Sequence, residues 1–395
     1  MKKKIISGVL SYSLTIAFVL FMLAGMAATL LRDKTQYSYF ENRLLSSKPQ
    51  FTAEGVLDGS FFSGIDTYVK DYAAGRNTLL KLDTYINKDI LHRPVVNDVV
   101  IGDDILLPEN DYETVDNAAI SASAEKAAKN VRVHADTTES YGGHFYYVAV
   151  PCQYVCYEDK YPSYLNSRSE YTKASSSALF AEFEKLGINY IDMYDAFVKM
   201  GRPDSYTSTV DNHYEIEGGY TTYLAIMERL NTDTDLNFEI LTNYTKSELP
   251  NTYLGSRSRK LFGMWDTEEK LSVITPAEDI PFKRYDNGEE VESRVYHSPQ
   301  NEWDDVLYGL YMGGDIAETL IDTDREDRPD ILIYGDSFTN AVECVLWYSC
   351  DTMRSVDLRH YNDMTIDEYI EKYRPDVVIC LRDYEALIDT YGNGQ

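Results

Sequence analysis

The N-terminal pattern is a long uncharged segment behind a basic tip. Lys2, Lys3 and Lys4 precede residues 5–31, which carry no charge, and Arg32 follows. As a helix this segment spans roughly 40 Å, enough to cross a bilayer core of about 30 Å. The lysines favour a cytoplasmic N-terminus. We therefore expect a single-pass cell-membrane protein whose C-terminal region is extracytoplasmic.

A cleaved secretory signal is the alternative interpretation of this segment. Its apolar core is usually about 7–15 residues long and precedes a small-residue cleavage site. Ala24, Ala27 and Ala28 resemble such a site. The length of the apolar run favours an uncleaved signal anchor, and both alternatives export the rest of the chain.

The next pattern is helical and amphipathic. Apolar residues recur at helical spacing in residues 57–91, where we predict a helix that includes Phe61, Ile65, Tyr68, Val69 and Tyr72. We assign residues 1–32 to the cytoplasmic tip and transmembrane anchor. Residues 33–110 are assigned to a helical and irregular segment that packs on the main domain.

From about Tyr112 the pattern alternates between helix and strand. An alanine-rich helical stretch runs towards Ser140. The predicted strands are residues 144–150, 188–191, 331–334, 352–358 and 377–381, and the predicted helices are residues 171–186, 339–348 and 366–373. Such alternation is typical of an α/β fold with a mainly parallel sheet covered on both faces. We assign residues 111–395 to this domain, with a polar, irregular insertion at about 231–328.

Net charge and tyrosine content indicate which classes of ligand the protein can bind. The chain carries a formal charge of −28. Residues 1–32 contribute +4 from three lysines and one arginine, so the remainder carries −32. This charge argues against nucleic acid as a partner, because binding a polyanion requires clustered lysine and arginine. The 34 tyrosines favour a cleft that binds carbohydrate, because a tyrosine ring has an apolar face and a polar tip. Buried tyrosine is nevertheless common in all proteins.

Cysteine and histidine usage gives little sign of a metal centre. The five cysteines are Cys152, Cys156, Cys344, Cys350 and Cys380, and at least one is unpaired or bonds another chain because the number is odd. The close pairs are placed to oxidise outside the cell. No spacing matches a zinc site, so we expect no structural metal and no cofactor.

A Gly-Asp-Ser motif supplies a candidate nucleophile. Gly335, Asp336 and Ser337 directly follow the predicted strand 331–334 and precede a predicted helix. Ser337 therefore sits on the turn at the carboxyl end of a buried strand, where backbone N–H groups of the following helix can stabilise an oxyanion. The structural alternative is a helix-capping serine.

Asp211 and His213 supply a candidate base. They lie two residues apart in a polar loop. The carboxylate can accept from one ring nitrogen and fix the tautomer, which leaves the other nitrogen to take a serine proton. By itself, such a pair is more often a structural loop histidine, and Ser337 makes the catalytic interpretation stronger.

These motifs resemble those of the DHHW family of bacterial exported proteins, which is similar to the alginate O-acetylation proteins AlgJ and AlgX and has an SGNH-hydrolase-like fold. The resemblance covers most of the exported region. Its residues are Glu41-Asn42-Arg43-Leu44, Pro49, Asp71, Arg76, Ile101-Gly102, Leu106-Leu107, Asp211, His213, Gly218, Leu254-Gly255-Ser256, Tyr334-Gly335-Asp336-Ser337-Phe338, Asp357-Leu358-Arg359 and Pro375-Asp376-Val377-Val378.

The resemblance implies a three-layer SGNH-like domain with Ser337 as nucleophile, His213 as base and Asp211 as its orienter. The Asp–His pair precedes the serine, so the motif order is circularly permuted relative to ordinary SGNH enzymes. The family tetrad reads Asp-Asn-His-Tyr here. Tyr214 thus replaces the tryptophan, which keeps an aromatic residue and is expected to alter substrate stacking.

The oxyanion donors are only partly identified. The SGNH asparagine should follow the last strand, where this chain has Leu381-Arg382-Asp383-Tyr384. We therefore expect the Ser337 N–H as a donor, with Gly335, Asp336, Tyr214, Arg359 and Arg382 as supporting residues. Structural ion pairs are the favoured role for both arginines, and for Glu41, Arg43, Asp71 and Arg76.

The resemblance implies O-acetyl transfer to an extracellular polysaccharide through an acyl-serine. It also implies a membrane-bound O-acyltransferase as the partner that delivers the acyl group. Two alternatives stay open. One is a carbohydrate esterase that uses the same triad with water, and the other is an inactive scaffold that binds glycan or an assembly partner.

Overall fold

A computed structural model describes residues 2–31, 36–41, 43–110, 115–199 and 206–390. Arg32, Asn42 and Tyr112, which entered the predictions above, lie outside these ranges. The chain divides into two compact units. The first contains residues 1–97 and 259–264, and the second contains residues 98–258 and 265–395.

The first unit is mainly helical. Its elements are α1 (Lys2–Leu31), β1 (Tyr37–Ser38), β2 (Arg43–Leu44), α2 (Ala53–Leu57), α3 (Ser60–Tyr72), α4 (Arg76–Tyr85), the π-helical turn η1 (Ile86–Ile90) and β3 (Val95–Val96). Within α1, Tyr12–Thr29 has a mean hydropathy of 1.8 and is long and apolar enough to cross a membrane. An N-terminal signal sequence has the same properties.

The predicted helix over residues 57–91 is wrong as one continuous element. Residues 73–75 separate α3 from α4, and Gly75 adopts a φ of 75°. Periodicity located the apolar faces of both helices, but it does not detect a short break between two helices of similar pattern.

Ion pairs among Glu41, Arg43, Asp71 and Arg76 stabilise the first unit. Arg76 donates to both carboxylate oxygens of Glu41 at 2.7 and 2.9 Å, and Arg43 lies 2.6 Å from Asp71. The hydrogen bond from Arg43 holds the pKa of Asp71 well below its usual range. The structural role predicted for these four residues is therefore confirmed.

The second unit is built on a mixed eight-stranded sheet. The strand order is β11-β10-β12-β14-β13-β15-β6-β7. The bounds are β6 (His144–Val150), β7 (Tyr190–Asp192), β10 (Lys283–Asp286), β11 (Glu289–Val291), β12 (Glu318–Asp322), β13 (Ile331–Gly335), β14 (Thr352–Asp357) and β15 (Val377–Asp383). Strands β14, β13, β15, β6 and β7 run parallel, whereas β12, β10 and β11 extend the sheet antiparallel. The expected α/β class with a mainly parallel sheet is confirmed.

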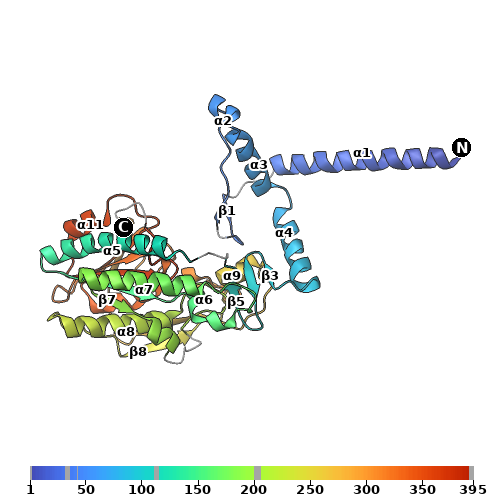
Figure 1. Ribbon diagram of the computed structural model, residues 1–395. Coiled ribbons are helices and arrows are strands. Elements are labelled where there is room, and N and C mark those ends of the chain that lie inside the picture. The colour runs from blue at the N-terminus through green and yellow to red at the C-terminus, as the bar shows by residue number, and fades with distance from the viewer. Residues whose placement is uncertain (1, 32–35, 42, 111–114, 200–205, 391–395) are drawn as a thin grey trace. The chain divides into compact units, whose positions relative to one another are not determined.

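The centre of this sheet is buried on both faces. Every residue of β13 and β15 is buried, as parallel strands between helices require. In Figure 1, α5 and α7 lie on one side of the sheet and α8 on the other. The helices of this unit are α5 (Asn117–Ser140), α6 (Gln153–Cys156), α7 (Ser169–Leu186), α8 (Ile216–Asp233), α10 (Asn340–Leu346) and α11 (Ile366–Tyr373), together with the first three residues of α9 (Ser256–Lys260).

The strand order reverses at β13. The chain leaves β13 through α10 to reach β14 on one side, and then crosses through α11 to β15 on the other side. Right-handed crossovers in opposite directions place their helices on opposite faces. Accordingly α10 contacts α8, whereas α11 contacts α5. In open α/β sheets, ligands bind at the carboxyl ends of strands at such a switch point.

Smaller elements complete the second unit. Two antiparallel pairs are β4 (Val99–Ile101) with β5 (Leu106–Pro108), and β8 (Tyr244–Glu248) with β9 (Ser272–Pro276). The short turns are η2 (Glu158–Lys160), η3 (Asp195–Lys199), η4 (Tyr308–Leu310), η5 (Ser337–Thr339) and η6 (Trp347–Ser349). Within the described ranges no cysteine forms a disulfide, and all five cysteines are buried.

Candidate active site

Ser337 lies at the carboxyl end of β13, at the point where the strand order reverses. It opens the 3-10 turn η5, which leads directly into α10. Gly335 makes this turn possible, because a Cβ at that position would lie 2.0 Å from the carbonyl oxygen of Leu381 on β15. The glycine of the motif therefore allows β15 to approach closely beside the serine.

Asp336 caps the turn that carries Ser337. Its Oδ1 accepts a hydrogen bond from the Phe338 N–H at 3.0 Å. Its Oδ2 lies 3.5 Å from Nε of Arg382, and both side chains are buried. Asp336 thus fixes the backbone around the serine, which agrees with a supporting role.

His213 lies within hydrogen-bonding distance of both its predicted partners. Its Nε2 is 2.7 Å from Ser337 Oγ, and its Nδ1 is 2.6 Å from Asp211 Oδ1. An ionised carboxylate only accepts hydrogen bonds, so Nδ1 carries the proton and Nε2 accepts from the serine hydroxyl. The structure therefore brings together the three residues that the sequence singled out.

Asp211 is buried, and its carboxylate accepts several hydrogen bonds. Its carboxylate accepts from the backbone N–H groups of Asn212 at 2.6 Å and Ser256 at 2.5 Å, in addition to the His213 ring. Burial alone would raise the pKa of Asp211, but its interactions with the His213 ring and with the Ser256 N–H outweigh this effect. The pKa is held well below its usual range, so Asp211 stays anionic beside the imidazole.

Gly255 explains the Leu254-Gly255-Ser256 motif. A Cβ at Gly255 would lie 2.3 Å from the carbonyl oxygen of Val210. The close approach lets the Ser256 N–H reach Asp211, and Arg257 N–H donates to the same Val210 carbonyl at 3.0 Å. This segment therefore holds Oδ2 of the carboxylate, whereas His213 bonds Oδ1.

Tyr308 is a site residue that the sequence reasoning missed. Its ring stacks on the His213 imidazole with centroids 3.9 Å apart and planes 9° apart. The ring of Phe338 lies 5.0 Å from the imidazole. Tyr308 belongs to the polar stretch that was interpreted as an insertion, and a single tyrosine there carries no motif that would reveal the contact.

Glu269 and Arg257 were missed for the same reason. Glu269 accepts hydrogen bonds from Ser208 Oγ at 2.5 Å and from the Thr209 N–H at 2.8 Å, just before Asp211 in the chain. Arg257 donates to Asn212 Oδ1 at 3.2 Å. Both side chains hold the loop that presents the Asp–His pair.

Tyr214 supports the site from within the core. Its ring is fully buried, and its hydroxyl donates to the Phe338 carbonyl. The expectation that Tyr214 alters substrate stacking is wrong, because a fully buried ring cannot contact a substrate. Its hydrogen bond instead links the Asp–His loop to the turn that carries Ser337.

Both candidate arginines form ion pairs. Arg359 lies 2.6 Å from Asp357 and 3.0 Å from Asp315. Arg382 pairs with Asp336 and donates to the Ala386 carbonyl at 2.9 Å. These contacts agree with the structural role that the sequence favoured for them.

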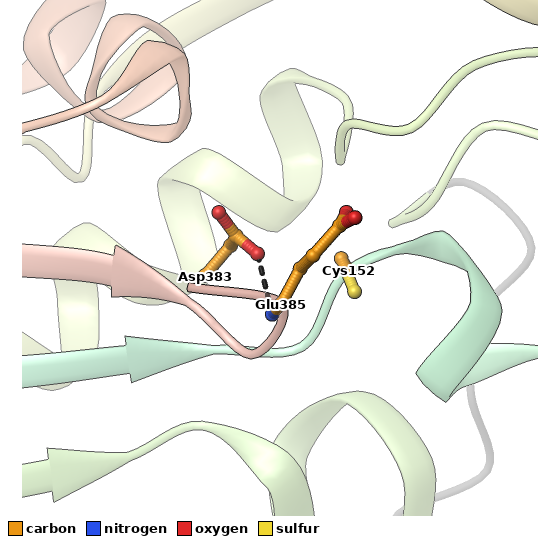
Figure 2. A group of neighbouring side chains, drawn as sticks. All are labelled: Cys152, Asp383 and Glu385. Carbon is orange, nitrogen blue, oxygen red and sulfur yellow. Dashed lines mark hydrogen bonds between the residues drawn. The ribbon is translucent and has the colours of Figure 1, made fainter. Parts of the chain in front are cut away.

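Two groups of side chains among the described residues have the spacing of metal ligands. In one group, Asp315, Asp357 and His360, both carboxylates already bind Arg359. The other group is Cys152, Asp383 and Glu385, drawn in Figure 2.

The second group has features that disfavour a cation. The Glu385 N–H donates to Asp383 Oδ1 at 2.6 Å. Burial raises the pKa of the Cys152 thiol and of the Asp383 carboxyl, so both resist the charged form that a metal requires. We assign no metal to either group.

A serine joined through a histidine to a buried aspartate, at the switch point of a parallel sheet, defines an α/β protein with a serine–histidine–aspartate site. The family model described as DHHW protein matches residues 41–141, which confirms the resemblance to that family. The matched residues do not include Ser337, His213 or Asp211. A sequence search of curated proteins gives no match.

Several solved structures are similar to this chain, and those with TM-scores above 0.5 share its fold. Bacillus cereus PatB1 with a sulfonyl adduct is 19% identical, with a TM-score of 0.59 over 75% of this chain and 96% of that chain. A DHHW family protein from Eubacterium siraeum is 17% identical, with a TM-score of 0.54 over 75% and 94% of the two chains. The O-acetyltransferase domain of Pseudomonas putida AlgJ is 12% identical, with a TM-score of 0.48 over 74% and 93%.

Proposed function

We propose that this protein carries out acyl-ester chemistry through a covalent acyl-serine at Ser337. The observation that carries the proposal is the continuous chain of hydrogen bonds from Ser337 Oγ through His213 to Asp211. An inactive scaffold needs no such chain. The distance of 2.7 Å between Ser337 and His213 therefore favours an enzyme.

The first half-reaction forms the acyl-enzyme. Ser337 Oγ attacks the acyl carbonyl of the donor ester while His213 Nε2 takes the hydroxyl proton. The Ser337 N–H, at the start of η5, serves as a donor to the oxyanion of the tetrahedral intermediate. The bond from the acyl carbon to the donor oxygen then breaks, and His213 returns the proton to that oxygen.

The second half-reaction transfers the acyl group. A sugar hydroxyl gives its proton to His213, and its oxygen attacks the acyl carbon. The bond to Ser337 Oγ breaks, and the serine recovers its proton from His213. Anionic Asp211 stabilises the imidazolium that forms in each half-reaction. With water as the acceptor, the same steps make the protein an esterase.

We favour O-acetyl transfer to an exported polysaccharide, with esterase activity as the second candidate. The sequence resemblance to the alginate O-acetylation proteins supports an acetyl group and a polysaccharide acceptor. We further propose that the second unit is a circularly permuted, SGNH-like three-layer domain. In this account α1 anchors the chain with its C-terminal region outside the cytoplasm, beside a membrane-bound O-acyltransferase that supplies the acyl group.

Turnover of a chromogenic acetyl ester by the detergent-solubilised full chain tests this proposal. We expect release of the chromophore by wild type and its loss, by roughly three to six orders of magnitude, in Ser337→Ala. Added glycan should accelerate release and become acetylated if the protein is a transferase. Release that glycan leaves unchanged would favour the esterase, and equal turnover by Ser337→Ala would reject both.

A further inference from the structure

Two adjoining cavities are lined by residues that follow the carboxyl ends of strands β6, β7 and β15. In strand order, β13 is followed by β15, β6 and β7, and all four run parallel. Asp383 at the end of β15 pairs with Val150 at the end of β6, and Ala149 pairs with Asp192 at the end of β7. The residues that follow these strand ends therefore form one row that begins at Ser337.

The cavities lie along this row. The first has a volume of about 260 Å³, and its lining includes Tyr154, Tyr194 and Tyr384, which follow β6, β7 and β15. The second has a volume of about 820 Å³. The two share Val155, Glu158, Ser167 and Tyr194, so they adjoin each other, and we refer to them together as the groove.

Direct contacts connect this groove to the candidate active site. The Gln153 N–H donates to the carbonyl of Asn212, between Asp211 and His213, and the next residue, Tyr154, lines the groove. Asp383 and Glu385 flank Tyr384, and their carboxylates lie within 4.8 Å of the Cys152 thiol (Figure 2). The segment after β6 thus contacts the Asp–His loop through Gln153 and lines the groove through Tyr154 and Val155.

The chemistry of the lining fits sugar rings. Phe180 and Tyr194 supply partly exposed aromatic surface, and the ring of Tyr194 lies 6.0 Å from that of the buried Tyr384. The serines 167, 169 and 176 and Thr172 place hydroxyl groups among these rings. Aromatic faces pack against the apolar face of a sugar ring, and hydroxyl groups exchange hydrogen bonds with its rim.

The charge of the groove limits which glycan can bind. Glu158, Asp159 and Asp192 line the two cavities, and Lys173 is the single basic residue among their described lining residues. Lys173 already bonds Glu158 at 3.1 Å. The chain as a whole carries −28. A chain of uronates or phosphates would therefore meet more acidic than basic side chains in these two cavities, and be repelled.

We propose that this groove binds a glycan without net negative charge, built from neutral or amino sugars, and presents its hydroxyl groups to Ser337. The assignment of the bound glycan as the acyl acceptor depends on the proposed function. The binding site itself rests on the aromatic lining, the charge and the position along the sheet edge.

Binding measured by calorimetry with the detergent-solubilised full chain tests the proposal. The Ser337→Ala background prevents turnover, so that only binding is recorded. The probes are hexamers of N-acetylglucosamine, glucosamine and mannuronate. We expect the first two to bind more tightly than the mannuronate hexamer. Equal or tighter binding of mannuronate, or no binding of any hexamer, would overturn the proposal.

Substitution of Tyr194 locates the site. Tyr194→Ala should weaken binding of the neutral hexamer about three- to tenfold, whereas Tyr194→Phe keeps the ring and should bind as the parent does. The matched control is Tyr285→Ala, because Tyr285 is equally half-buried but lies on β10 at the far side of the sheet. Unchanged binding by Tyr194→Ala would place the glycan elsewhere.

The outcome separates this inference from the proposed function. Binding that depends on Tyr194, together with an unreactive Ser337, would leave the glycan site standing and reject the acyl chemistry. A reactive Ser337 without saccharide binding would reject the glycan site alone.

Discussion

At the scale of single residues, the site is organised around the orientation of His213. Asp211 binds one edge of the imidazole, Ser337 lies at the other edge, and Tyr308 covers a face. A catalytic base acts only when its ring is held within a few tenths of an ångström of the correct position. Tyr308 therefore acts as a positioning residue through its contact with His213.

Two replacements of Tyr308 distinguish the contribution of its stacked ring to kcat from that of its hydroxyl group. Its hydroxyl has no hydrogen-bond partner in the described structure, so Tyr308→Phe should leave kcat on a chromogenic acetyl ester within about twofold of wild type. Tyr308→Leu removes the stacked ring and should lower kcat roughly ten- to a hundredfold with little change in KM. Equal loss in both variants, or none in Tyr308→Leu, would contradict a role through stacking.

The sequence predicted the reacting residues but not those that hold them. Ser337, Asp211 and His213 could be found because the motif, its position after a strand and the family resemblance all point to them. Tyr308 and Glu269 could not, because each acts through a contact with a residue far away in the chain. Only the fold brings such residues together.

At the scale of elements, the decisive contact is between β13 and β15. Gly335 faces the Leu381 carbonyl so closely that any side chain would collide with the neighbouring backbone. The carbonyl belongs to the parallel ladder and cannot move without disturbing β15. The position of Ser337 therefore depends on the absence of a Cβ two residues earlier.

Gly335→Ala should destabilise the fold and remove activity together. We expect a loss of more than about 3 kcal/mol in the free energy of unfolding, measured by chemical denaturation. Gly309→Ala is the matched control, since its nearest neighbours lie 3.8 Å or more from the added Cβ, an ordinary contact distance. A Gly335→Ala protein as stable and active as Gly309→Ala would show that this close approach is not needed.

Most elements could be predicted because their apolar runs are short and clearly bounded. The strand 144–150 and the helix 366–373 agree with β6 and α11, and the helix predicted over residues 171–186 ends at Leu186 as expected. The break between α3 and α4 was missed. The strands of residues 283–322 were missed as parts of the main sheet, because short antiparallel strands with many polar residues resemble loops in sequence.

At the scale of the whole molecule, buried carboxyl groups make stability depend on pH. Glu343 of α10 is buried and accepts a hydrogen bond from Ser355 of β14 at 2.6 Å. Burial raises its pKa, and the hydrogen bond from Ser355 offsets only part of this effect. The folded chain therefore holds a proton on Glu343 at pH values where the unfolded chain has released it.

The direction in which Glu343 changes stability with pH follows from how many protons the folded and unfolded states bind. The folded state binds more protons than the unfolded state between the ordinary glutamate pKa of about 4.3 and the raised pKa of Glu343. The contribution of Glu343 to stability is thus present below this window and is lost as the pH rises through it. Glu343→Gln has no such proton and should lose less stability than wild type between pH 5 and pH 8.

Denaturation of both proteins at the two pH values checks this prediction. The exposed Glu371→Gln serves as the control for removing one carboxylate from so acidic a chain. The prediction fails if Glu343→Gln shows the same pH dependence as wild type and Glu371→Gln.

The central claim is that Ser337 is a nucleophile activated by His213. The most direct measurement is covalent labelling of the full-length protein with a sulfonyl fluoride, followed by peptide mass spectrometry. The account predicts a sulfonyl group on Ser337, none in Ser337→Ala, and labelling slowed roughly a thousandfold in His213→Ala. Absence of the adduct from Ser337 in folded wild-type protein, or an unchanged rate in His213→Ala, would contradict it.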